Sequence, residues 1–161
     1  MKYLLFLIFL FFIIHNTFSQ KSIPNITIHD LNNNPVEVKI ITNENLTLLS
    51  FWATWCLPCL NELNNINDNY EKWLDEIDFK FIAVSIDENR TISRVRPLVN
   101  GNGWAFKILL DKNQDLKRAL QINNIPYTLI INNGDIVFRH TGYIPGNEDL
   151  LFEKLKEFNN K

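Results

Sequence analysis

A strand of the fully buried type leads directly into a pair of cysteines, and this arrangement limits the possible folds more than any other feature. Residues 46–52 form an almost continuous apolar and β-branched run, which is typical of a strand covered on both faces. Cys56 and Cys59 follow after a short turn. From there apolar side chains recur every three or four residues as far as Ile77, which predicts an amphipathic helix that begins at Cys56 or Pro58. The cysteines are therefore expected at the N-terminus of a helix that leaves a central strand.

The rest of the chain alternates between strand and helix patterns. The expected elements are a hairpin (27–29 and 36–40), a strand (79–86) that ends at Asp87 as a possible helix N-cap, a helix (90–99) interrupted or ended near Pro97 and Gly101, a strand (106–110), a helix (114–120), a second hairpin (127–131 and 136–141) and a final amphipathic helix (149–158). This order predicts an α/β sandwich, with a central mixed sheet flanked by helices and an N-terminal β-hairpin extension. No linker or repeat divides it, so we expect one domain over residues 20–161.

The N-terminus has the pattern of an export signal. Lys2 precedes an uncharged apolar run over residues 3–14, which is shorter than the roughly 20 residues that a membrane span needs. Thr17 and Ser19 place small residues before a cut at Gln20. We therefore expect residues 1–19 to be a signal peptide, or an uncleaved N-terminal anchor, and the remainder to be exported, periplasmic in location.

The charge and the cysteine content of the chain argue against nucleic-acid binding and against a purely structural disulfide. A net charge of -2 with dispersed lysines and arginines offers no basic face for nucleic acid. The chain has only two cysteines, and closing so short a loop stabilises a fold by only about 2 kcal/mol. The pair is therefore expected to carry chemistry. Backbone N–H groups at a helix N-terminus favour the thiolate of Cys56, and Cys59 lies one turn further on.

Other interpretations of this pair remain open. A Cys-x-x-Cys pair is also half of many zinc sites, but the sequence has no second pair. A copper-binding or copper-delivery module could use Cys56, Cys59 and His140. A peroxidase of the peroxiredoxin group needs Pro and Thr seven and three residues before its reactive cysteine, where this chain has Leu49 and Ala53. A non-catalytic interaction domain is a further possibility.

Five segments together resemble the TlpA/ResA-type thioredoxins, which are exported thiol–disulfide oxidoreductases. The segments are Phe51-Trp52-Ala53-Thr54-Trp55-Cys56-Leu57-Pro58-Cys59 with Glu62, Phe81-Ile82-Ala83-Val84-Ser85-Ile86-Asp87, Leu109-Leu110-Asp111, Ile125-Pro126-Tyr127-Thr128 and Gly134-Asp135-Ile136-Val137. The resemblance implies a thioredoxin-like sandwich that needs no metal, flavin or nucleotide cofactor. It also implies disulfide-containing substrate proteins, a membrane thiol reductase as electron donor, and a monomer.

The resemblance assigns roles by position. Cys56 matches the family's nucleophile, Cys59 its resolving cysteine and Pro126 its cis-proline, beside which an extended substrate segment pairs. Glu62 matches an acid that could accept the proton of Cys59, and the alternative is an exposed acid of the first helical turns. The residues expected to contact substrate are Trp55, Leu57, Pro58, Ile125 and Tyr127.

The chain departs from thioredoxins at positions that affect mechanism. Ser50 stands where classical thioredoxins carry a buried Asp, so proton transfer should follow another route. Tyr127 replaces the commoner Thr after Pro126 and alters the substrate groove. Leu57 and Pro58 offer no charge to hold a thiolate, which favours a reductant over a strong oxidant. The family resemblance implies a role in cytochrome c maturation or in general disulfide reduction outside the cytoplasm.

Overall fold

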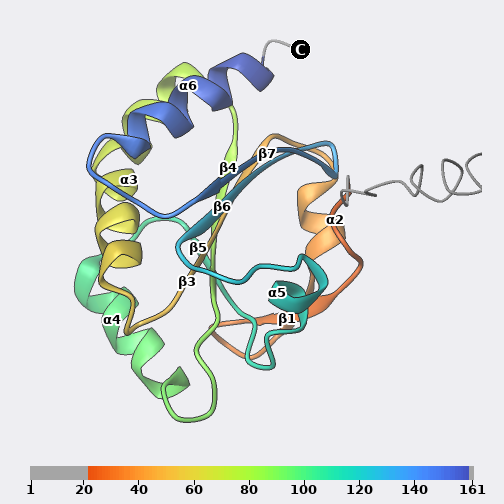
Figure 1. The fold of residues 1–161 in the computed structure, drawn as a ribbon, viewed down its shortest axis with the longest axis vertical. Helices are drawn as coiled ribbons and strands as arrows, with labels where there is room; N and C mark the ends of the chain where they lie inside the picture. Colours follow the sequence, from red (N-terminus) through yellow and green to blue (C-terminus); the bar gives the residue numbers. More distant parts are fainter. Residues whose placement is uncertain (1–21, 160–161) are drawn as a thin grey trace, which may run out of the picture.

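The computed structural model describes residues 22–159, which form a mixed sheet with helices on both faces (Figure 1). The strands are β1 (Thr27–Asp30), β2 (Pro35–Glu37), β3 (Thr47–Trp52), β4 (Lys80–Ser85), β5 (Lys107–Leu110), β6 (Tyr127–Asn132) and β7 (Asp135–Thr141). The helices are α2 (Val38–Thr42), α3 (Leu57–Glu76), α4 (Val95–Asn102), α5 (Asp115–Ala119) and α6 (Asn147–Asn159), with the 3-10 helix η1 (Ile92–Arg94) before α4. The predicted α/β sandwich with its N-terminal hairpin is confirmed.

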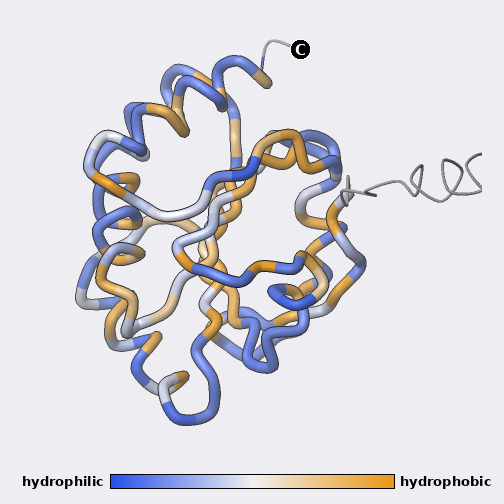
Figure 2. The backbone as a smooth tube through the Cα atoms, in the orientation of Figure 1, coloured by the Kyte–Doolittle hydropathy of each residue, from blue (hydrophilic) through white to orange (hydrophobic). Residues whose placement is uncertain are grey.

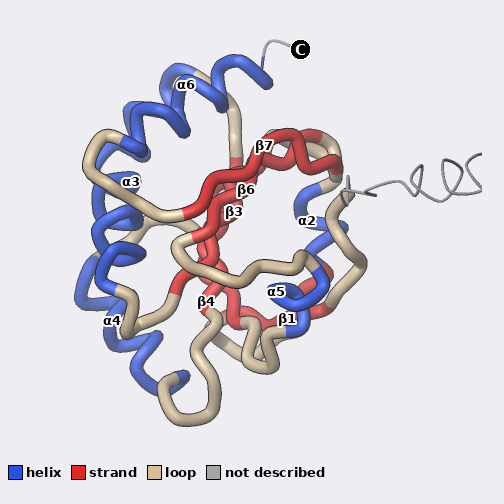
Figure 3. The backbone as a smooth tube through the Cα atoms, viewed as in Figure 1, coloured by secondary structure: helices blue, strands red, loops and turns tan. Residues whose placement is uncertain are grey.

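The order of strands brings three loops together at one edge of the sheet. The sheet runs β2-β1-β5-β4-β3-β6-β7, and β3, β4 and β5 in its middle are parallel to one another. Figure 3 shows the strands in red between the helices. β6 is antiparallel to β3 on one side, and β1 is antiparallel to β5 on the other. Because parallel strands end at the same edge, the segments that follow β3, β4 and β5 lie at that edge. The segment after β3 carries the cysteines.

The centre of the sheet is covered on both faces. Every residue of β3 is buried, and so is every residue of β4 after Lys80. Figure 1 shows α3, α4 and α6 on one side of the sheet and α2 and α5 on the other. Figure 2 shows apolar residues along the inner strands and hydrophilic residues on the outer loops. Four large aromatic side chains are buried in this core: Trp52, Trp73, Phe79 and Phe81.

The second strand of the N-terminal hairpin is shorter than predicted. Strand β2 ends at Glu37, and Val38 begins helix α2, where the sequence predicts strand as far as Ile40. An extended strand would put Val38 and Ile40 on the same face, but Val38 is fully buried and Ile40 is 64% exposed. Val38 and Thr42, four residues apart, instead share the buried face of a helical turn. The prediction was wrong because so short a helix has too little periodicity to detect.

The helix after β4 also begins later than predicted. Asp87 does not cap it, because the segment that follows Asp87 is a turn and regular α-helix starts only at Val95. Pro97 lies in the first turn of α4, where its missing N–H leaves no hydrogen bond unmade. The helix also continues through Gly101 and ends when Gly103 adopts a left-handed conformation, with φ 63°. Pro97 therefore does not interrupt the helix, which ends one residue after Gly101, close to the predicted position.

The expected signal peptide, residues 1–19, lies outside the described residues. Between residues 22 and 159, no helix has both the length and the apolar character that a membrane crossing requires.

Candidate active site

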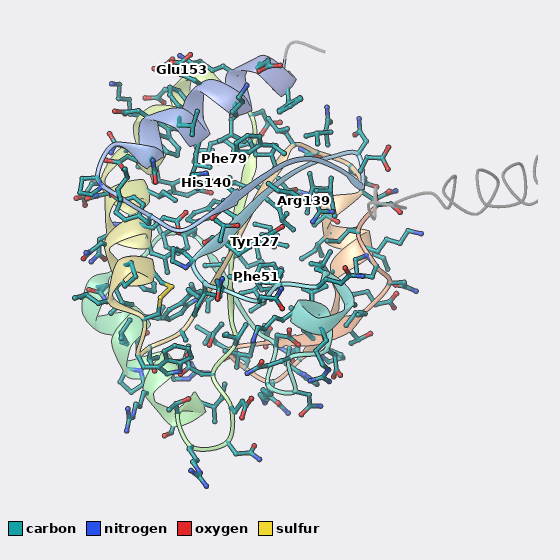
Figure 4. All side chains as sticks on the ribbon, in the orientation of Figure 1. Phe51, Phe79, Tyr127, Arg139, His140 and Glu153 are labelled. Atoms are coloured by element: carbon teal, nitrogen blue, oxygen red, sulfur yellow. A yellow bond between two sulfur atoms is a disulfide. The ribbon has the colours of Figure 1, made fainter. Side chains whose placement is uncertain are left out.

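The two cysteines form a disulfide at the start of α3. Cys56 is the N-cap residue of this helix, Cys59 is its third residue, and their Cα atoms are 5.3 Å apart. Figure 4 shows this bond in yellow at one end of α3. Cys59 is fully buried, whereas Cys56 remains 6% exposed. Cys56 is therefore the sulfur that a second molecule reaches first.

The position of Cys56 favours a nucleophilic sulfur in the reduced protein. Helix α3 is 20 residues long, and the unpaired N–H groups at its N-terminus create a positive potential. That potential stabilises a thiolate relative to a thiol, and the thiolate is the form that attacks a disulfide. Two backbone hydrogen bonds of 3.1 Å hold the residue in place, one donated by the Cys56 N–H to Ala53 and one accepted by its carbonyl from Leu60.

Exposed apolar side chains lie beside Cys56 in the chain. Trp55 and Leu57 are 59% and 68% exposed, and Pro58 is exposed as well. Large apolar side chains that remain exposed next to a reactive group are typical of a surface that a partner covers. All three are exposed as a substrate contact requires, and their contact with a substrate stays a prediction.

The second predicted part of the site is the segment before β6. The Ile125–Pro126 peptide bond is cis, as the family resemblance predicts. Tyr127 pairs with Phe51 of β3, and both residues are labelled in Figure 4. This register places Pro126 next to the end of β3, from which the turn to Cys56 starts. Ile125 is half-buried, and within residues 22–159 its N–H and carbonyl make no hydrogen bond.

Glu62, one helical turn after Cys59, is fully buried between α3 and the sheet. The Thr128 hydroxyl of β6 donates to Glu62 Oε1 at 2.7 Å, and the Ser50 hydroxyl of β3 lies 3.5 Å from Oε2. Ser50 and Thr128 face each other across the two strands, 3.2 Å apart between their oxygens. Each hydroxyl has one proton, so the carboxylate receives at most two hydrogen bonds from them. The alternative interpretation of Glu62 as an exposed acid is wrong.

Burial raises the pKa of Glu62 from 4.5 to about 7. Removal of the carboxylate from water is the main cause, because a dry environment penalises the charged form. The hydrogen bonds from Thr128 and Ser50 lower the pKa again only in part, and the charge of Glu148 raises it further. A carboxyl group with a pKa near neutrality can both accept and return a proton in a neutral solution.

Thr128 is the residue that sequence reasoning missed as a partner of Glu62. Ser50 was singled out only because it replaces the Asp of classical thioredoxins. In this chain the buried carboxylate comes from α3, and the Ser50 hydroxyl of β3 lies against it. The neighbouring Thr128 follows from the pairing of β3 with β6, which no local pattern specifies. Its position two residues after Pro126 was the one available signal.

A second buried carboxylate, that of Asp87, fastens the turn that carries the cysteines to the end of β4. Asp87 is fully buried, and its Oδ2 accepts hydrogen bonds from the Thr54 N–H (2.8 Å) and the Ser85 hydroxyl (2.9 Å). Its Oδ1 accepts from the Thr54 hydroxyl at 2.7 Å. Thr54 lies two residues before Cys56, so these bonds fix the path of the turn. A helix cap was the wrong prediction because this distant partner cannot be seen locally.

Removing the Asp87 carboxylate is expected to destabilise the fold. Asp87→Ala leaves the Thr54 N–H and hydroxyl without their partner and should lower the free energy of unfolding by about 3 kcal/mol, whereas Asp87→Asn retains an acceptor and should cost about 1 kcal/mol. Urea unfolding of the disulfide form measures both values. Asp68→Asn, on the exposed face of α3, is the control, with an expected change within about 0.5 kcal/mol. A loss for Asp87→Asn as large as that for Asp87→Ala would contradict this role.

The copper hypothesis lacks its third ligand. His140 lies on β7 opposite Thr128, and its Nε2 is 3.2 Å from Asn147 Oδ1. In Figure 4 the His140 label is well separated from the yellow disulfide. Across the part of the chain that the structure describes, no three His, Cys, Asp or Glu side chains are grouped so that they could hold a metal ion. The structure therefore does not join His140 to the cysteine pair.

The peroxidase interpretation lacks its polar groups. Leu49 and Ala53, at the positions where that chemistry needs Pro and Thr, are both fully buried. Ala53 contributes only its carbonyl, which accepts the Cys56 N–H. No hydroxyl at position 53 is available to bind a peroxide.

Comparisons with known proteins agree with this geometry. The pattern of the AhpC/TSA family matches residues 20–140. The thiol-disulfide oxidoreductase ResA of Bacillus thuringiensis (strain Al Hakam) is 30% identical over 138 residues, which are 85% of this chain and 72% of ResA. ResA of Halalkalibacterium halodurans is 30% identical over 134 residues, 83% of this chain and 72% of ResA. The solution structure of an uncharacterized thioredoxin-like protein from Porphyromonas gingivalis is 38% identical, with a TM-score of 0.73 over 90% of this chain and 95% of the other.

Proposed function

This chain belongs to the AhpC/TSA family and is a thiol–disulfide oxidoreductase of the ResA type, and we propose that it is exported and reduces disulfides in substrate proteins through Cys56 and Cys59. The observation that carries the proposal is the placement of the two sulfurs. Cys56 is the helix N-cap and keeps an exposed edge, while Cys59 is fully buried behind it. The Cys56 sulfur can therefore react with a substrate, whereas the Cys59 sulfur can react only with Cys56.

The reaction has two exchange steps. The Cys56 thiolate attacks one sulfur of the substrate disulfide, whose other sulfur leaves as a thiolate and takes up a proton. Cys59 then loses its proton and attacks Cys56, which breaks the mixed disulfide and releases the second substrate thiol. Two electrons pass to the substrate, and the Cys56–Cys59 bond seen in the structure is the product.

Glu62 is suited to accept the proton that Cys59 loses. It follows Cys59 by three residues on α3, a spacing that places both side chains on one side of the helix. Its pKa of about 7 leaves a substantial fraction of the group able to accept a proton in neutral solution. Solvent does not reach either group, because both are fully buried. A base within the protein is therefore needed to deprotonate Cys59.

The substrate is held at the backbone beside Pro126. Among the described residues, the N–H and carbonyl of Ile125 have no partner. Ile125 also stands next to the end of β3, so an extended segment can pair with it as an added strand. Tyr127, half-buried, and the exposed rings and side chains at positions 55, 57 and 58 supply the apolar contacts around that segment. This mode binds main chain and tolerates varied sequences.

Residues other than the two cysteines support the direction of the redox reaction and the export of the protein. Leu57 and Pro58, between the cysteines, carry no charge that would hold a thiolate, which favours a reductant. The N-terminal pattern, with residues 1–19 as signal peptide or anchor and 20–161 as the domain, supports export. A membrane thiol reductase would then regenerate the monomeric protein. The substrates we propose are apocytochrome c during maturation, or disulfide-containing proteins outside the cytoplasm in general.

Reduction of insulin by the dithiol form tests this function. The pre-reduced protein should convert insulin disulfides to thiols, with an equal amount of the Cys56–Cys59 disulfide formed. Cys56→Ser should reduce insulin no faster than buffer, because the buried Cys59 cannot reach a substrate. Titration of thiols in both proteins after the reaction shows whether the insulin thiols formed match the thiols lost by the enzyme. An active Cys56→Ser variant, or an inactive native protein, would overturn the proposal.

A further inference from the structure

An open hollow adjoins the turn that carries Cys56. It has a volume of about 510 Å³, within the range of roughly 300–1,000 Å³ that is usual for ligand sites. Trp55 lines it on the side of the cysteines, and Gln114 together with five residues of the segment after β4 lines the rest. All of these residues follow β3, β4 or β5, so the hollow lies at the edge where the parallel strands end.

Hydrogen bonds fix one wall of the hollow and occupy its acidic group. The Gln114 carboxamide donates to the Ile86 carbonyl at 3.3 Å and to Glu88 Oε1 at 2.6 Å. Its oxygen accepts from Lys117 Nζ at 2.9 Å. The carbonyl of Glu88 also accepts the backbone N–H of Thr91, at 2.8 Å. The wall is therefore held in shape, and the Glu88 carboxylate already has a donor.

Arg90 is the charged group of the hollow that has no partner in the part of the chain that the structure describes. Its side chain is exposed, and within residues 22–159 the guanidinium makes no hydrogen bond and no ion pair. An arginine presents a planar fork of donors that matches a carboxylate. Figure 2 shows the loop after β4 as strongly hydrophilic. Among the residues that line the hollow are this cation and the exposed Trp55 ring.

We propose that this hollow is a specificity site that holds an acidic side chain of the substrate protein, a few residues from the disulfide that Cys56 attacks. Arg90 binds the carboxylate, and Trp55 packs against the backbone or apolar stem of the same segment. The inference rests on the proposed function, because the segment must be presented next to Cys56. Bulk charge does not explain such a preference, since the chain carries a net charge of -2 and would repel an acidic peptide weakly.

Paired peptide disulfides test the inference. Each pair differs only in an Asp or an Asn, placed two positions before the cysteine in one pair and two positions after it in the other. In at least one pair the reduced protein should reduce the Asp peptide with a kcat/KM about fivefold higher, as expected for one partly exposed ion pair. Arg90→Gln should bring that ratio to one, and Arg90→Glu should bring it below one. Raising the salt concentration should also shrink the ratio.

Arg94→Gln is the matched control, because Arg94 is also exposed, lies four residues away and does not line the hollow. It should keep the native ratio. A preference unaffected by Arg90→Gln, or equal rates for the peptides of both pairs, would overturn the inference while leaving disulfide reduction intact. Calorimetric binding of Cys-to-Ser versions of the peptides to the disulfide form gives the same ranking without redox chemistry. Equal affinities in this assay would overturn the inference, whether or not the peptides are reduced. A failure to reduce any peptide would instead overturn the proposed function.

Discussion

Cys59→Ser should leave the protein covalently attached to its substrates through Cys56. The helix N-terminus still favours the Cys56 thiolate, so the first exchange proceeds. No second sulfur remains to break the mixed disulfide, because within residues 22–159 the cysteines are the 56 and 59 pair alone. Turnover should therefore fall to background while a mixed disulfide accumulates. Non-reducing gel electrophoresis with mass spectrometry of the adducts measures both effects and identifies the substrates.

The matched control for this experiment is Cys56→Ser. Its remaining sulfur is fully buried in the native fold, so it should collect almost no adduct. Equal trapping by the two variants would mean that either sulfur can attack, and the assignment of Cys56 as the nucleophile would be wrong.

Glu62→Gln should make the protein more stable at neutral and higher pH and should slow its release of reduced substrate. The pKa of Glu62 is raised from 4.5 to about 7 on folding, so the folded state holds the proton more tightly than the unfolded state. Stability is therefore lost as the pH rises from about 4.5 through about 7, and the loss amounts to about 3 kcal/mol above that range. Glutamine has no charge to bury and can keep a hydrogen bond with Thr128. The variant should match the native protein near pH 4 and exceed it by up to about 3 kcal/mol at pH 8.

The kinetic effect of Glu62→Gln should fall on the second exchange step. Without the carboxylate, Cys59 loses its proton to no nearby base, and release of the reduced substrate should slow by about a hundredfold. The dependence of that rate on a group with a pKa of about 7 should disappear as well. Stopped-flow decay of a preformed mixed disulfide, measured across pH, reports both.

Glu71→Gln, on the exposed face of the same helix, serves as the control and should change neither property. If Glu62→Gln retained both the native pH slope of stability and the native rate of substrate release, the carboxylate would have no part in proton transfer. A change in stability alone would mean that Glu62 is a buried structural acid only.

The sequence predicted the parts of the site that are local in the chain. A run of buried side chains over residues 47–52 has no plausible place except the middle of a covered sheet. The helix that follows repeats its apolar residues for five turns, so its period is unmistakable. Cys56 and Cys59 span the junction between the two elements, and their position at the start of α3 follows from these neighbours alone.

The parts that could not be predicted depend on which strands pair. The hydrogen bonding of the Glu62 carboxylate depends on Ser50 and Thr128, and these two residues are close together only because β6 pairs with β3. Spacing along α3 placed the acid on the side of Cys59 but did not distinguish burial from exposure. The same limit applies to Asp87, whose partner Thr54 is 33 residues away. Short helices such as α2 cannot be predicted for another reason, because five residues are too few to show a helical period.

Equilibration of the protein with thiol–disulfide buffers of stepped ratio tests the central claim most directly. After alkylation of free thiols, mass spectrometry counts the dithiol and disulfide forms at each potential. We expect one reversible two-electron transition, with a midpoint well below the value of about −120 mV that marks a strong oxidant. If the two forms do not interconvert, the sulfur pair is not a redox centre, and the account of this protein as a thiol–disulfide oxidoreductase is contradicted.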